Sequence, residues 1–161
     1  MIEPTLVITL LDRSYTVLKQ QADGLTHEDS LLQMPFRANC MNWVLGHILS
    51  SRSGFMIALG LTPIWTDEQR AIYLRGSDAI TEANCDKAAR LEDMLRDLDR
   101  SQEQIVACLQ TKTFEDMKLP SDRPNMSMGE RLGHSVWHEA YHTGNTEALR
   151  QLAGMDDQVI K

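Results

Sequence analysis

Apolar side chains recur along this chain at the three-to-four-residue spacing of an α-helix, in four long segments. The segments are residues 5–22, 39–59, 83–112 and 127–153. Gly24 and Gly60 follow the first two segments, as glycine commonly does after a helix. Ser127, with Glu130 three residues later, forms a capping box at the start of the last one. No segment alternates as a strand would, so the pattern predicts an all-α fold, a four-helix bundle.

The remaining segments are read as connections. Residues 67–75 are predicted to form a short helix, and residues 26–37 a connector on which His27 is exposed. Residues 113–125 hold two prolines and no clear periodicity, so we expect a long crossover loop there. A chain of this length suits one core, which predicts a single domain over residues 1–161.

Two of the predicted helices have unusual faces. Between Leu132 and Leu149 the only charged residues, counting histidine as neutral, are Glu139 and Glu147, which favours a mostly buried last helix. The helix at 39–59 instead carries a flank of small side chains that is interrupted by one histidine. That flank consists of Cys40, His47, Ser51, Gly54 and Ala58. Small side chains allow close approach, so we expect another helix or a ligand against this flank.

Composition narrows the range of functions. The chain has 16 basic and 23 acidic residues, a formal charge of −7 and no basic tract, so nucleic acid is not an expected partner. No apolar run reaches the ~20 residues of a membrane span, and the first residues lack a secretory signal, which predicts a cytoplasmic protein. Cys40, Cys85 and Cys108 are far apart and are expected to be small buried hydrophobes.

Three histidines on the last predicted helix carry the strongest chemical signal. His134, His138 and His142 are four residues apart, so they share one helical face. The outer two are roughly 12 Å apart along the helix axis, whereas the ligand atoms of a zinc-like ion lie only ~3 to 4 Å apart. Two neighbours can therefore share an ion while another helix, substrate or water completes its shell. His47, on the flank of small residues, is the best candidate for a third ligand.

A rival motif occupies the same residues. His138 to His142 match H-E-x-x-H, in which two histidines hold zinc and the glutamate, here Glu139, activates water. The longer metzincin motif needs glycine and histidine further on, where this chain has Asn145 and Ala148. Metal-assisted hydrolysis, with Glu139 or His134 as the base, stays open as an alternative.

Residues 42–48 (NWVLGHI) and 134–145 (HSVWHEAYHTGN) together resemble the DinB/YfiT-like superfamily. The resemblance implies a four-helix bundle with a long crossover connection. It also implies a divalent metal ion held by His47, His138 and His142, and a homodimer.

By the same resemblance, His134 lies beside the metal site. Where this family often has Arg-Gly-Gln after the last histidine, the chain has Thr143, Gly144 and Asn145. An anionic contact from that arginine is therefore not expected here.

Characterised members of this superfamily include transferases and isomerases that use low-molecular-weight thiols such as mycothiol, bacillithiol or glutathione. An ion held by three histidines would keep open positions for a thiol or water, so the leading hypothesis is a metal-dependent transferase that activates a thiol against a small electrophile. Tyr141 is expected to line the pocket or donate a proton, and Trp43 and Trp137 to lie in the core or a dimer interface. Zinc or nickel is the expected ion, with iron, manganese and copper as alternatives. A metal-dependent hydrolase and a non-catalytic metal-binding or ligand-binding protein of a stress response remain alternatives.

Overall fold

The computed structural model describes residues 2–81, 83–157 and 159 of the 161-residue chain. The ends of the predicted domain, residues 1 and 160–161, lie outside this part, as do residues 82 and 158. The long helices are α1 (Pro4–Ala22), α3 (Met41–Ala58), α5 (Leu91–Gln110) and α6 (Met128–Leu152). The short ones are α2 (His27–Ser30), α4 (Asp67–Ala71) and the 3₁₀ turns η1 (Cys85–Lys87) and η2 (Asp116–Lys118). The described residues contain no strand, which confirms the predicted all-α class.

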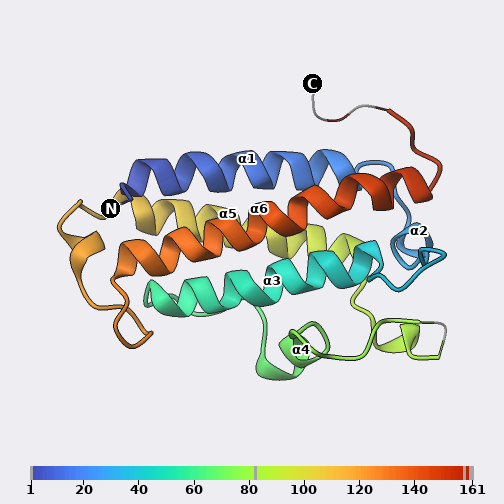
Figure 1. The fold of residues 1–161 in the computed structure, drawn as a ribbon, viewed down its shortest axis with the longest axis horizontal. Helices are drawn as coiled ribbons and strands as arrows, with labels where there is room; N and C mark the ends of the chain where they lie inside the picture. Colours follow the sequence, from blue (N-terminus) through green and yellow to red (C-terminus); the bar gives the residue numbers. More distant parts are fainter. Residues whose placement is uncertain (1, 82, 158, 160–161) are drawn as a thin grey trace.

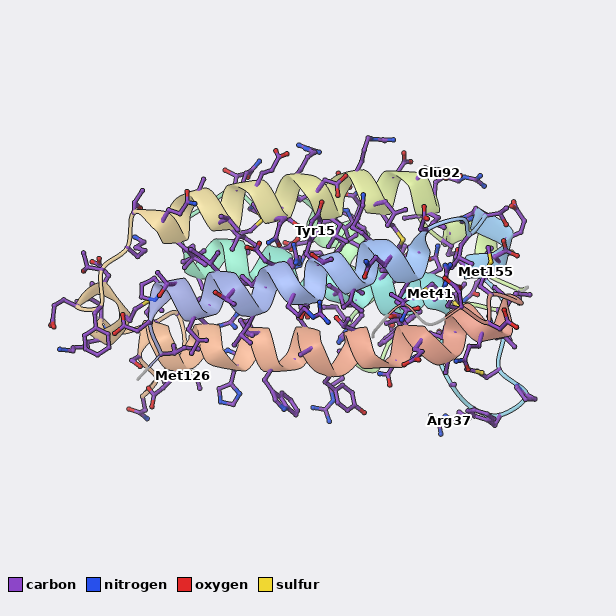
Figure 2. The ribbon with its side chains drawn as sticks, turned by 90° about the horizontal axis from the view of Figure 1, so that it is seen from above. Tyr15, Arg37, Met41, Glu92, Met126 and Met155 are labelled. Atoms are coloured by element: carbon purple, nitrogen blue, oxygen red, sulfur yellow. The ribbon has the colours of Figure 1, made fainter. Side chains whose placement is uncertain are left out.

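The four long helices pack as a bundle in which α1 and α3 each contact both α5 and α6. In Figure 1, α1 and α6 run in one direction and α3 and α5 in the other. Viewed from above in Figure 2, α1 lies between α5 and α6. None of the helices in the described ranges is both long and apolar enough to cross a membrane.

The crossover connection is residues 59–90, not the predicted 113–125. Because α3 and α5 are parallel, the chain between them must return along the length of the bundle (Figure 1). Residues 111–127 instead join α5 and α6 at one end. Prolines and missing periodicity identify a loop, but the direction of the next helix depends on packing. We call residues 59–90 the crossover segment.

Tyr73 fastens the crossover segment to α3. Its ring lies against Gly46, where an added Cβ would be 2.2 Å from Tyr73 Cδ1. Its hydroxyl donates to Asn42 Oδ1 at 3.0 Å and accepts from the Ala89 backbone N–H at 2.8 Å. Burial raises the pKa of this phenol to about 12, so it stays protonated and able to donate. Glycine at position 46 is thus what allows the crossover segment to approach α3.

The hydrogen bonds of Ala89 with Tyr73 and Asn42 explain why α5 begins at Leu91 and not near residue 83. Ala89 donates its backbone N–H to Tyr73 and accepts at its carbonyl from the Asn42 amide at 2.9 Å, and Arg90 before the helix is extended. These bonds hold the backbone outside a helix, although its side chains have a helical spacing. The other three long helices begin and end within two residues of the predicted limits.

His27 is buried, contrary to the sequence expectation of an exposed loop residue. The residue is 7% exposed, and its Nδ1 accepts from the backbone N–H of Leu91 at 3.3 Å. The ring therefore satisfies an otherwise unpaired donor at the start of α5. Cys40 is buried as predicted, whereas Cys85 and Cys108 are only half-buried.

Helix α6 is buried on one side only, so the prediction of a mostly buried helix was wrong. Val136, Glu139 and Thr143 face the interior, but Trp137 and Tyr141 are 66% and 59% exposed. Aromatic, histidine and small residues fill the outer face in place of charges. A helix with few charged residues can therefore still have an exposed face, as α6 does.

We expect Gly46→Ala to destabilise the fold by about 1–3 kcal/mol, because the new methyl group overlaps the Tyr73 ring. Gly144→Ala is the matched control, since Gly144 is also helical and has open space at its Cβ position. It should be neutral or stabilise by up to about 1 kcal/mol through helix propensity. Urea denaturation followed by circular dichroism measures the free energy of unfolding of both variants. Equal effects of the two variants would contradict the packing of Tyr73 on Gly46.

Candidate metal centre

Three histidines from two helices meet at one point between α3 and α6. His47 comes from α3, and His138 and His142 lie one turn apart on α6. One ring nitrogen from each can be chosen so that all three lie within 4.8 Å of one another. His47 Nε2 and His138 Nε2 are 3.0 Å apart, and the ring of His142 is centred 4.7 Å and 4.5 Å from those of His47 and His138. Such spacings fit nitrogens that share one zinc-like ion.

The ring of His47 is fixed by its surroundings. Its Nδ1 is 2.6 Å from the backbone carbonyl oxygen of Tyr73, which can only accept, so the proton of the neutral ring is on Nδ1. Trp43 stacks on the same ring, with centroids 4.7 Å apart and planes 11° apart. The lone pair of His47 is therefore on Nε2, the atom that faces His138. A hydrogen bond to the second nitrogen is the usual support of a metal-binding histidine.

The two histidines of α6 are held in the neutral form. Burial, and then the nearby His138 and His47, lowers the pKa of His142 to about 4. Burial and then His47 also lower the pKa of His138. Neutral imidazole is the form that binds metal, and the buried Nδ1 of His142 has no hydrogen-bond partner among the described residues. The donor set and this orphaned nitrogen both fit a divalent ion.

Glu139 lies on the interior face of α6, next to the face that carries His138 and His142. Its carboxylate accepts two hydrogen bonds from the Arg52 guanidinium, at 2.9 and 2.7 Å, and its side chain is 4% exposed. The arrangement in which the glutamate of H-E-x-x-H faces the metal is thus not formed here. The sequence motif could not reveal this, because the arginine partner is far away on α3.

The other two predicted site residues lie at the rim of the cluster. His134 is exposed one turn before His138 and does not join the three histidines. Tyr141 is exposed, with its ring edge-on to His142 at 5.0 Å between centroids. Trp43 is buried, as expected of a core residue, whereas Trp137 lies on the surface.

Two clefts are each lined by two or more of the clustered histidines. The larger, about 700 Å³, is lined by all three histidines with Trp43, Trp137 and Tyr141. Arg37, which projects from the loop before α3 in Figure 2, also lines it. The smaller, about 350 Å³, shares His47 and His138 and is lined by four arginines. Sequence reasoning missed these arginines, because they come from α4, two loops and α6 without a common motif.

Comparison with known proteins gives the family. The profile of the DinB superfamily matches residues 10–145, which is most of the chain. The chain belongs to the DinB superfamily. This confirms the resemblance seen in the two histidine-containing segments, and the three histidines are a group that could hold the divalent metal expected of a DinB protein.

A solved structure supports the fold of this DinB protein. A conserved protein from Enterococcus faecalis superposes with a TM-score of 0.70 at 17% sequence identity, covering 95% of this chain and 98% of the other. At this identity the likeness concerns the fold alone. No curated protein matches the chain significantly.

The ligand assignment can be tested by metal content. We expect His47→Ala and His142→Ala to lose most of the metal that copurifies with the wild type, because each removes one of three clustered nitrogens. His134→Ala is the matched control on the same helix and should keep it. Elemental analysis of protein purified without added metal gives the result, with folding checked by circular dichroism. Wild-type metal content in the two ligand variants would exclude this triad.

Metal-free protein should lose stability on mild acidification. The pKa of His142 is about 4 in the folded chain and near its ordinary value of 6.5 when unfolded, so between these values only the unfolded chain binds the proton. Stability therefore falls as the pH drops from 6.5 towards 4. His142→Asn removes this contribution, so its melting temperature in EDTA should fall less between pH 7 and pH 5 than that of the wild type. An equal or larger fall would contradict the shifted pKa.

Proposed function

We propose that this DinB protein is a metal-dependent transferase that joins a low-molecular-weight thiol to a small electrophile. The observation that carries the proposal is the opening of the three-histidine cluster into a cleft of about 700 Å³. A purely structural metal site is usually closed by four protein ligands. Here no fourth His, Cys, Asp or Glu of the described residues joins the cluster.

The ligand chemistry supports a metal of intermediate softness. Three neutral imidazoles suit zinc or nickel, and they also accept iron, copper or, less favourably, manganese. A bound divalent ion supplies Lewis acidity, which lowers the pKa of a thiol so that it ionises near neutral pH. His47, His138 and His142 would hold the ion, and the cleft would hold the two organic reactants.

The proposed reaction is a substitution at carbon. The thiol gives up its proton to solvent, its sulfur forms a bond to the electrophilic carbon, and the bond from that carbon to the leaving group breaks with both electrons going to the leaving group. Tyr141 lines the cleft and is exposed, so its phenol can donate a proton to a basic leaving group and regain one from water. Trp43 and Trp137 give the cleft apolar walls for the electrophile.

The alternatives receive less support. A hydrolase would need a base for water, and Glu139 is engaged by Arg52 at two oxygens. His134 is the remaining candidate base, on the rim of the smaller cleft. A non-catalytic protein of a stress response would not need open cleft volume beside its metal. The cytoplasmic location and the homodimer stay predictions.

A thiol-transfer assay tests the proposal. Zinc-loaded or nickel-loaded protein is incubated with 1-chloro-2,4-dinitrobenzene and with glutathione, cysteine or 3-mercaptopropionate, and the absorbance of the thioether product is followed. We expect metal-dependent product formation above the uncatalysed rate, abolished in His142→Ala. Chloride leaves without a proton, so Tyr141→Phe is assayed with an epoxide, whose ring opening produces a basic alkoxide; there it should lower kcat at unchanged metal content. Fully loaded protein that accelerates none of these reactions, or that hydrolyses esters without thiol, would contradict a transferase.

A further inference from the structure

The smaller cleft, which we call the arginine pocket, is a concentration of positive charge on an acidic protein. Its lining includes Arg70, Arg75, Arg123 and Arg131 and contains no Asp or Glu. The chain as a whole has 23 acidic against 16 basic residues. The overall composition of the chain, in which acidic residues outnumber basic ones, therefore does not explain why four arginines line a cleft of about 350 Å³.

The arginines converge on the flank of small residues of α3. Two come from the crossover segment, one from the connection before α6 and one from α6 itself. An added Cβ at Gly54 would lie 3.7 Å from Arg131 Nη2 and 3.9 Å from Arg70 Nη2. The guanidinium groups of Arg131 and Arg70 thus both lie close to α3 at Gly54, which has no side chain. The small side chains at this flank leave the floor of the pocket open.

The positive charge of the pocket is only partly neutralised by the protein. Arg131 pairs with Asp122 at 3.1 Å, and Arg70 pairs with Asp67, which is almost fully exposed, at 3.0 Å. The side chains of Arg75 and Arg123 form no hydrogen bond or ion pair within the described residues.

Further signs of unmet charge come from Arg70 and Arg131. The Nε of Arg70 is buried and has no hydrogen-bond partner among the described residues. Burial, and then the nearby Arg123, lowers the pKa of Arg131, so like charges face each other here. Such an arrangement is unfavourable unless an anion fills it.

We propose that the arginine pocket binds the carboxylate or phosphate group of the small-molecule substrate whose reacting atom lies at the histidine cluster. Guanidinium groups bind both kinds of anion through paired, charge-assisted hydrogen bonds. His47 and His138 line the pocket and also belong to the cluster, so one molecule can extend from the arginines to the histidines. The inference rests on the proposed function for the reacting end of that molecule, whereas the anion site itself is independent of the reaction.

Direct binding is the first test. Zinc-loaded protein is titrated by calorimetry with inorganic phosphate and, separately, with 3-mercaptopropionate, which carries a thiol and a carboxylate. Arg75→Gln and Arg123→Gln should each weaken binding about tenfold or more, because each removes a charged donor. Both side chains are exposed and unpaired in the described structure, so these variants should fold.

Arg96→Gln is the matched control, because it removes the same charge from an exposed position on α5 outside the pocket. It should bind both probes as the wild type does. His142→Ala, depleted of metal, should still bind phosphate with wild-type affinity. Unchanged affinity in the two pocket variants, an equal loss in Arg96→Gln, or loss of phosphate binding in His142→Ala would each overturn the proposal.

The thiol-transfer assay separates this proposal from the transferase. Arg75→Gln and Arg123→Gln should raise KM for 3-mercaptopropionate several-fold more than KM for 2-mercaptoethanol, a neutral thiol. If transfer is absent but the arginine variants still weaken phosphate binding, the transferase fails and the anion site stands. If transfer occurs and neither thiol distinguishes the variants from the wild type, the anion site fails and the transferase stands.

Discussion

A buried ion pair between α3 and α6 sets the orientation on which the histidine cluster depends. The Arg52 guanidinium bonds both oxygens of Glu139 and also donates to Ser101 Oγ on α5 at 3.1 Å, with the two charged side chains 1% and 4% exposed. Leaving either charge without its partner in the interior costs about 3–5 kcal/mol. Rotation of α6 would break the pair, so Glu139 is confined to the inner face. His138 precedes it and His142 follows it by less than one turn, and both are thereby turned towards His47.

Much of the bundle could be predicted from the sequence, because a helix is specified by neighbours three and four residues apart. The same geometry limited a shared ion to two neighbouring histidines of α6, and the family resemblance selected His138 and His142. His47 stood out as the one large polar residue on a flank of small ones. What could not be predicted depends on contacts between distant segments. No pattern of neighbouring residues indicates the direction of α5 or the partner of Glu139. The hydrogen bonds of the Ala89 backbone keep the residues before Leu91 out of α5, although their side chains have a helical spacing.

The crossover segment contributes more to the site than its irregular sequence indicates. Tyr73 packs on Gly46, and its carbonyl oxygen accepts the Nδ1 proton of His47. Two of the four pocket arginines belong to the same segment. One connection therefore orients a candidate ligand and supplies charge next to it. This accounts for the closeness of Asn42, Gly46 and His47 in sequence, since Asn42 and Gly46 hold the segment whose carbonyl bonds the histidine.

His47 and His138 are 91 residues apart in sequence and lie on different helices. An ion held by both would act as a reversible cross-link across the bundle, comparable in topology to a disulfide but dependent on concentration. Its contribution to folding would grow with the logarithm of the free metal concentration above the dissociation constant. The persistence of the folded chain in a cell would then follow metal supply, so that a metal-starved cell would retain less of this protein whatever reaction it performs.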